Sequence, residues 1–144
     1  MNMPDVNILI YAHRDQYPHH KFYKSWLESL CVGTEPFFLS PLVAVGFIRI
    51  VTNPSFSDYP TPLLQALTFI ETILSSEQCY QPEIGKNHWK FVRRLCESSG
   101  ARGKLVADAQ HAALALEHGC TWVTRDHDFK KFKSQGLRME LLEP

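Results

Sequence analysis

The chain has 144 residues, 44% of them hydrophobic, and its 15 basic and 15 acidic side chains give a formal net charge of zero. This length suits one domain over residues 1–144, and the ordinary apolar fraction excludes a disordered chain. A net charge of zero excludes tight nucleic-acid binding driven by overall charge, although it leaves room for a local basic face.

No apolar stretch approaches the roughly 18 residues of a membrane span, and residues 1–15 lack the basic and apolar segments of a signal peptide. The four cysteines, Cys31, Cys79, Cys96 and Cys120, form no CxxC pair. This spacing favours buried, reduced thiols over disulfides or a zinc site. We therefore expect a cytoplasmic protein without a membrane partner.

The first half of the chain alternates short strand patterns with helix patterns. Phe22, Trp26 and Leu30 repeat at helical spacing, which predicts an amphipathic helix. In chain order we expect a strand ending near Asp5, helices over 7–12 and 19–30, a strand within 35–41 and a buried helix over 42–52.

The second half continues this alternation. A helix is expected to begin at 60–62 with Thr61 as its cap, followed by a strand within 79–82. The next helix, over 88–98, should turn Trp89, Val92, Leu95 and Cys96 inward. A helix over 104–118 then ends at Gly119, and strands cover 120–124 and 137–141. Together these patterns predict an α/β fold on a largely parallel sheet.

Aspartates follow the predicted strands, where parallel sheets bind their ligands. Asp5 comes at the end of the first strand, Asp126 and Asp128 follow the strand over 120–124, and Asp108 lies early in a helix between apolar residues. Each has a structural alternative. Asp5 could cap the following helix, Asp126 or Asp128 could cap a turn, and Asp108 could be an exposed residue near the positive end of its helix.

Several aspartates without cysteine or histidine at ligand spacing suit Mg²⁺ or Mn²⁺ rather than zinc. Such an ion can activate a water molecule and neutralise charge that builds on a phosphate. The sequence contains no Walker loop, GxGxxG or GxSxG motif that would indicate another chemistry.

Four blocks that contain these aspartates resemble PIN-domain ribonucleases, in particular the VapC toxins of bacterial toxin–antitoxin pairs. Residues 3–12 (MPDVNILIYA) look like the family's DxN motif, and 46–54 (GFIRIVTNP) look like its second block. Residues 104–119 match the third block, and 124–129 (TRDHDF) match the closing motif. The similarity spans nearly the whole chain, with the blocks in the family's order.

The resemblance implies a three-layer α/β/α fold with a mainly parallel central sheet flanked by helices. It also implies a Mg²⁺-dependent endoribonuclease (Mn²⁺ is an alternative) that uses a metal-activated water and leaves a 5′-phosphate and a 3′-hydroxyl. The implied partners are RNA, a cognate VapB-type antitoxin and a second copy in a homodimer. Carried over by position, the metal ligands are Asp5, Asp108 and Asp126, Asp128 completes the catalytic acidic cluster, and the substrate-orienting residues are Asn7, Thr124 and Arg49.

One departure from the family pattern is Gly46, where many PIN domains carry a glutamate. It motivates an alternative function, a catalytically weak PIN domain that acts as an RNA- or protein-binding module. Arg49 has a structural alternative too, an ion pair at the end of its helix. An aspartate-based phosphohydrolase or receiver-like domain is disfavoured, because Asp5 is followed by Val6 and Asn7 rather than by a second aspartate.

Two basic runs are candidates for local RNA contacts. They are Lys86, Lys90, Arg93 and Arg94 in the first run and Lys130, Lys131 and Lys133 in the second. Each run alone is more typical of a solvated face. The aromatic residues Phe22, Trp26, Phe47, Trp89 and Trp122 occupy positions typical of the core, so base stacking is not the first interpretation.

Overall fold

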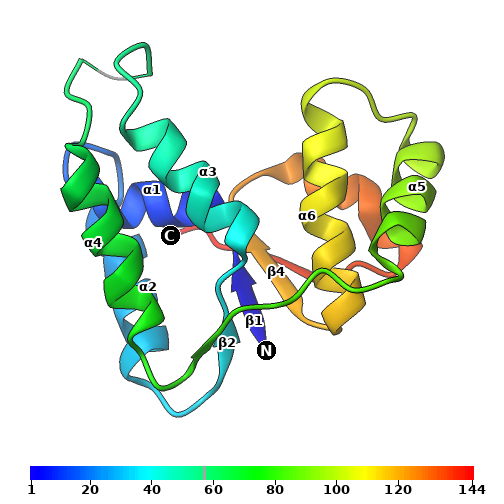
Figure 1. The fold of residues 1–144 in the computed structure, drawn as a ribbon, viewed down its shortest axis with the longest axis horizontal. Coiled ribbons are helices and arrows are strands. Elements are labelled where there is room, and N and C mark those ends of the chain that lie inside the picture. Colours follow the sequence, from blue (N-terminus) through cyan, green and yellow to red (C-terminus); the bar gives the residue numbers. More distant parts are fainter. Residues whose placement is uncertain (57) are drawn as a thin grey trace.

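The centre of the molecule is a five-stranded sheet in which all strands run parallel (Figure 1). The computed structural model describes residues 1–56 and 58–144. The strands lie in the order β3-β2-β1-β4-β5. Their bounds are β1 (Asn2–Pro4), β2 (Phe37–Phe38), β3 (Cys79–Tyr80), β4 (Thr121–Thr124) and β5 (Met139–Leu141).

Helices cover both faces of this sheet. In Figure 1, α1 to α4 lie on one side of the strands, and α5 and α6 lie on the other. This arrangement confirms the predicted α/β/α layering. The helices of the described residues are α1 (Val6–His13), α2 (His20–Val32), α3 (Pro41–Val51), α4 (Leu63–Leu74), α5 (His88–Ser99), α6 (Lys104–His118) and the 3-10 helix η1 (His127–Gln135).

The neighbouring strands β1 and β4 carry the part of the sheet that matters most for function. They pair in register, with Pro4 opposite Val123, and the ladder continues through Asp5, whose backbone N donates to the oxygen of Val123 at 2.8 Å. From β1 the chain continues to β2, which lies beside β1 on one side, while β4 lies beside β1 on the other side. The carboxyl ends of β1 and β4 therefore form the switch point at which open parallel sheets bind ligands.

Large apolar side chains from the sheet and from both helical layers form one continuous core. Its largest fully buried members include Trp122, Tyr23, Phe37, Phe47 and Phe129. Burying one such side chain contributes about 1.5–3 kcal/mol to the free energy of folding. Among the described residues, no helix combines the length and apolarity needed to cross a bilayer. The four cysteines are unbridged, and of the four only Cys120 is buried as expected, while Cys31, Cys79 and Cys96 are partly exposed.

The structure corrects three predictions about individual residues. Trp89 was expected in the core, but 71% of its surface is exposed. Thr61 does not cap α4, which begins after Pro62. Its Oγ1 atom lies instead 3.0 Å from the Nε2 atom of His13. The helix α3 was expected to be buried on most sides, yet Val45 is 67% exposed because α3 packs through one face only.

Candidate active site

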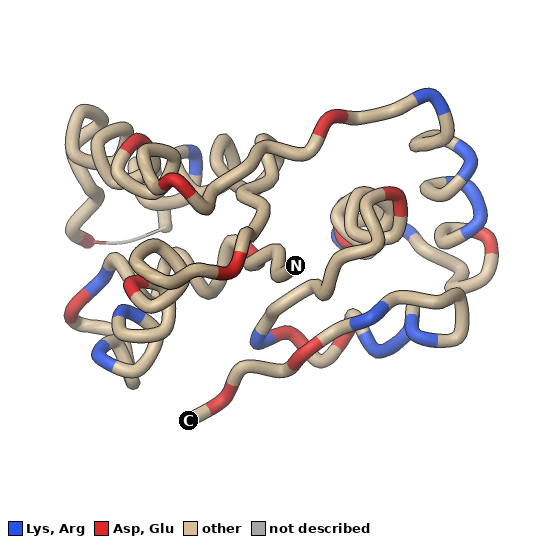
Figure 2. Tube along the Cα trace, turned by 90° about the horizontal axis from the view of Figure 1, so that it is seen from below, with Lys and Arg blue, Asp and Glu red and all other residues tan. Residues whose placement is uncertain are grey.

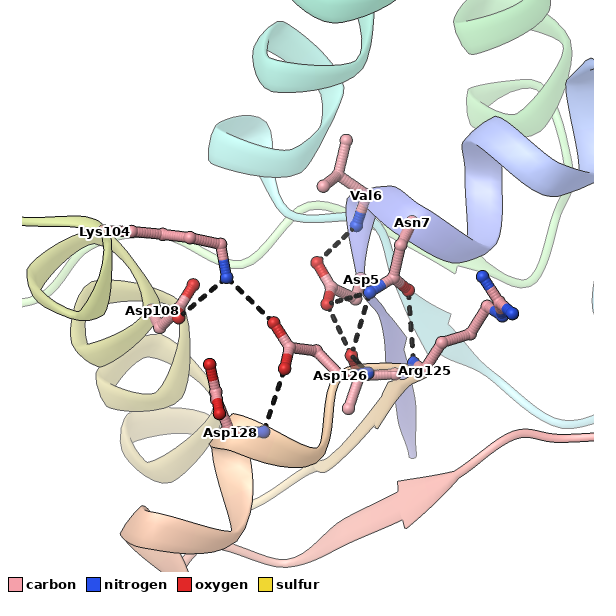
Figure 3. Close-up of polar contacts among 9 residues, drawn as sticks. Asp5, Val6, Asn7, Lys104, Asp108, Arg125, Asp126 and Asp128 are labelled. Carbon is pink, nitrogen blue, oxygen red and sulfur yellow. Dashed lines mark hydrogen bonds and ion pairs between the residues drawn. The ribbon is translucent and has the colours of Figure 1, made fainter.

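The four predicted aspartates lie together at the carboxyl ends of β1 and β4 (Figure 3). Asp5 directly follows β1, Asp126 follows β4 by two residues, and Asp128 lies in the first turn of η1. Asp108 reaches the same place from the second turn of α6. We call these residues the acidic cluster.

Asp5 is the most enclosed member of the acidic cluster, with 4% of its surface exposed. Its Oδ1 atom accepts a hydrogen bond from the backbone N of Val6 at 2.6 Å, so Asp5 is also the cap of α1. Its Oδ2 atom accepts from the hydroxyl of Thr124 at 2.5 Å and from the Nδ2 atom of Asn7 at 2.9 Å. The capping alternative is therefore confirmed, and it uses only one of the two carboxylate oxygens.

The hydroxyl of Thr124 joins the segments around Asp5. Besides donating to Asp5, its Oγ1 atom accepts from the Nδ2 atom of Asn7 at 3.2 Å and from the backbone N of Asp126 at 2.9 Å. The Oδ1 atom of Asn7 accepts from the backbone N of Arg125 at 3.3 Å. The start of α1 is thus tied to the loop after β4, and the carboxylate of Asp5 cannot rotate freely.

Lys104 is a member of the site that the sequence reasoning missed. Its Nζ atom lies 2.9 Å from Oδ2 of Asp126 and 3.3 Å from Oδ2 of Asp108, bridging two carboxylates (Figure 3). The spacing of four residues to Asp108 is a signal that could have found one of these contacts. No spacing rule predicts the contact with Asp126, which lies 22 residues away.

Burial, together with repulsion between neighbouring carboxylates, shifts the pKa values of the acidic cluster. Burial raises the pKa of Asp5 to about 6, hydrogen bonds from Thr124 and Val6 partly offset this, and the charges of Asp108 and Asp126 add to it. The contribution of Asp5 to metal-free stability is therefore present below its ordinary pKa of 3.8 and lost as pH rises through about 6. A carboxylate whose pKa is raised in this way is stabilised by taking up a proton or by a nearby cation.

Asp108 and Asp126 are shifted in opposite directions. Burial raises the pKa of Asp108, the ammonium of Lys104 opposes the rise, and the charges of Asp126 and Asp128 reinforce it. Partial burial acts to raise the pKa of Asp126 as well. Hydrogen bonds from Lys104 and from the backbone N of Asp128 outweigh that effect, and the pKa lies below its ordinary value. Lys104 therefore opposes the rise in the pKa of Asp108 and helps to lower the pKa of Asp126.

The acidic cluster offers carboxylates, the type of ligand that suits a hard cation, but two of them contact the ammonium of Lys104 instead. Carboxylate oxygens are the ligands that Mg²⁺ prefers. Within residues 1–56 and 58–144, however, no three His, Cys, Asp or Glu side chains are arranged so that they could hold a metal ion. Figure 3 shows that Lys104 lies between Asp108 and Asp126 at the cluster. Metal binding therefore requires that Lys104 give up its two contacts.

Arg49, predicted to orient the substrate, lies apart from the acidic cluster's contacts. It is exposed in the last turn of α3 and makes no hydrogen bond or ion pair within the described chain. Its role in substrate binding stays a prediction. Gly46 lies earlier in α3, where a Cβ atom would meet nothing closer than Cγ2 of Val6, at 4.0 Å. A Cβ atom at position 46 therefore fits beside Val6, the residue that follows Asp5.

Replacing Gly46 by Ala is expected to raise the free energy of unfolding by about 0.5–1 kcal/mol, because alanine has the higher helix propensity and the site has room for its methyl group. Urea unfolding followed by circular dichroism measures the change. Gly119→Ala is the matched control and should destabilise, because Gly119 ends α6 with a φ of 62°. A loss of stability in Gly46→Ala would show that position 46 needs a glycine.

Three comparisons place the chain among known proteins. The model of the PIN domain family matches residues 3–134. Ribonuclease VapC25 of Mycobacterium tuberculosis is 34% identical over 134 residues, which cover 93% of this chain and 94% of that protein. Ribonuclease VapC43 of the same species is 37% identical over 129 residues, covering 90% and 88%.

Solved structures show the same fold at lower identity. VapBC2 from Rickettsia felis, bound to a DNA fragment from its promoter, aligns with a TM-score of 0.69 and 22% identity over 96% of both chains. Mycobacterium tuberculosis VapC20, described as a sarcin-ricin loop cleaving toxin, aligns with a TM-score of 0.69 and 12% identity over 100% of both. With the family model and the curated relatives in agreement, the chain belongs to the PIN-domain family and, within it, to the VapC ribonucleases.

Proposed function

We propose that this chain is the toxin of a VapBC toxin–antitoxin system and that it hydrolyses RNA phosphodiester bonds with the help of Mg²⁺, or of Mn²⁺ in its place. The observation that carries the proposal is the acidic cluster at the carboxyl ends of β1 and β4, in which burial and like charge raise the pKa values of Asp5 and Asp108. A site of this kind favours a cation over several free carboxylates. An RNA substrate would also place the activity in the cytoplasm.

In this proposal Asp5, Asp108 and Asp126 hold the metal. When bound, the ion would polarise a water molecule and neutralise charge at the scissile phosphate. Thr124 and Asn7 hold the carboxylate of Asp5 in one orientation through the hydrogen bonds described above. Once Lys104 leaves the two carboxylates, its ammonium stays tethered at the edge of the cluster, where it can contact a phosphate oxygen.

A panel of transfer, ribosomal and synthetic RNAs, incubated with Mg²⁺, Mn²⁺ or EDTA, tests the proposal. Cleavage that requires metal supports the proposed hydrolysis. Binding of RNA without metal-dependent turnover would instead favour the second candidate function, a catalytically weak PIN module, for which Gly46 is the specific observation. Gly46→Glu would then be the informative variant, because a Cβ atom at position 46 meets no close contact.

Replacing Lys104 by Met is expected to tighten direct binding of Mn²⁺, which carries two charges, about thirtyfold. The substitution removes a positive charge that competes with the metal, and two charges about 4 Å apart interact by about 1 kcal/mol per unit charge even in water. Isothermal titration calorimetry without RNA measures this effect separately from activity. Lys21→Met, at an exposed position on α2, is the matched control and should leave affinity unchanged. Unchanged or weaker binding in Lys104→Met would contradict a competing role.

For partners we propose a VapB-type antitoxin and a second copy of the chain in a homodimer. Complexes of the VapBC and FitAB type among the structures of similar fold support the antitoxin. Exposed apolar side chains on α3 and α4 support further association, since Val45, Leu63 and Leu64 are 67%, 59% and 76% exposed. Light scattering on the purified chain, alone and with its antitoxin, measures both assemblies.

A further inference from the structure

An aromatic pocket lies beside the acidic cluster, on the other flank of α6. It has a volume of about 470 Å³ and is lined by His88, Trp89 and Val92 of α5 and by Gly103, Val106 and Ala107 at the start of α6. Trp89 is 71% exposed and Val106 is 42% exposed. An indole this exposed contributes little to the core, so its surface is available to a ligand.

The position of the pocket relates it to the acidic cluster. Lys104 directly follows the pocket residue Gly103, and Asp108 directly follows the pocket residue Ala107. One residue turns a helix by about 100°, so the pocket and the cluster lie on adjoining faces, on the order of 10 Å apart across the helix. A strand bound at the cluster can therefore reach the pocket with a neighbouring nucleotide. In Figure 1, α5 and α6 stand side by side at this end of the molecule.

The charge around the pocket is positive. Lys86, Lys90 and Arg102 are exposed on α5 and its flanking segments, and none has an ion-pair partner in the described parts of the chain. Figure 2 shows Lys and Arg gathered along the helix at the right of the view, although the chain as a whole carries no net charge. Unpaired cations beside an exposed aromatic ring fit a phosphate-bearing ligand with flat bases.

The wall of the pocket also holds a polar atom without a partner. His88 is 7% exposed, and its Nδ1 atom lies 3.3 Å from Oε2 of Glu117, which fixes the ring. Its Nε2 atom is buried and has no hydrogen-bond partner among the described residues. Buried polar atoms are normally paired, so this nitrogen is an exception among the residues that line the pocket.

We propose that this pocket binds an unpaired base of the RNA strand next to the cleaved phosphate. The base stacks on the indole of Trp89, while Lys86, Lys90 and Arg102 contact the adjoining phosphates. This inference rests on the proposed ribonuclease function and adds to it a subsite that selects single-stranded RNA. Single-stranded bases are the ones that proteins read by stacking on aromatic side chains.

Equilibrium binding in an uncleaving background tests the subsite. In Asp108→Asn protein without divalent metal, Trp89→Ala is expected to weaken binding of a labelled single-stranded RNA of about 12 nucleotides by about 5- to 150-fold. Trp89→Phe should restore most of the affinity, because it retains a stacking face. Tyr80→Ala is the matched control, since Tyr80 is an aromatic residue 54% exposed on β3, away from the pocket.

Salt dependence separates stacking from charge. Lys90→Gln should reduce the slope of log affinity against log salt by about 0.7, the value for one phosphate contact on a single strand. Trp89→Ala should leave that slope unchanged while lowering affinity at every salt concentration. An equal change of slope in both variants would overturn the stacking assignment.

The outcomes distinguish this inference from the function on which it rests. Unchanged RNA affinity in Trp89→Ala, with wild-type protein cleaving RNA, overturns the subsite alone. A change of oligomeric state in Trp89→Ala with unchanged RNA affinity assigns the surface to a second copy and also overturns it. If Trp89→Ala loses RNA affinity and the wild type cleaves no RNA, the RNA subsite is supported and the proposed hydrolysis is contradicted.

Discussion

Replacing Asp108 by Asn is expected to lower metal-dependent RNA cleavage by about a hundredfold or more while the protein stays folded. A bound metal stabilises developing phosphate charge by several kcal/mol, and each 1.36 kcal/mol is a factor of ten in rate. Asp108 is the proposed metal ligand that α6 supplies to the acidic cluster. Its loss therefore removes the only ligand that this helix contributes to the proposed set. Initial rates of cleavage at saturating Mg²⁺ measure the effect.

The fold should tolerate this substitution because burial already disfavours the charged form of Asp108. Asn has nearly the same shape and carries no charge, so the free energy of unfolding should be unchanged or slightly higher. Asp15→Asn is the matched control, since Asp15 is exposed beyond the end of α1. Full activity in Asp108→Asn would remove Asp108 from the proposed mechanism, and unfolding in that variant would give the side chain a structural role.

Much of the acidic cluster could be predicted from sequence because local signals and topology act together there. Gly103 and Gly119 bound α6 at the residues expected, which fixes where Asp108 falls on the helix. Strand patterns place Asp5 and Asp126 just after β1 and β4. Parallel strands bring their carboxyl ends to one edge of the sheet, so three residues far apart in sequence were correctly expected to converge.

The wrong predictions about individual side chains arise where the sequence pattern fits two orientations of a helix equally well. Packing against neighbouring elements then decides between them. In α5, His88, Trp89 and Val92 all fit an inward face by periodicity, yet Trp89 is exposed and His88 is buried. The packing of α5 against α6 and η1 determines which of the two adjoining rings is covered. The bridge from Lys104 to Asp126 is a contact of the same kind, because it depends on how α6 meets the loop after β4.

Thr124→Val is expected to reduce both stability and function, because the hydroxyl it removes joins Asp5, Asn7 and the backbone of Asp126. Thr124 is fully buried, so these groups would lose a partner that water cannot replace. The free energy of unfolding should fall by about 1–3 kcal/mol. Residues that orient metal ligands typically change affinity or activity by about 10- to 100-fold, and we expect Mg²⁺-dependent cleavage to fall by that factor.

The pH dependence of this variant tests the reason for the loss. The hydrogen bond from Thr124 lowers the pKa of Asp5, which burial otherwise raises, so removing it moves that pKa above about 6 and toward neutrality. Cleavage by Thr124→Val should therefore rise more steeply between pH 6 and 8 than cleavage by the wild type, as Asp5 ionises.

Thr124→Ser retains the hydroxyl and is the matched control, which should keep the wild-type pH profile and most of the activity. If Thr124→Val instead keeps the wild-type activity and pH profile while Thr124→Ser loses activity, the methyl group of Thr124 rather than its hydroxyl supports the site. The hydrogen-bonded connection between α1 and β4 would then have no part in positioning Asp5 for metal binding.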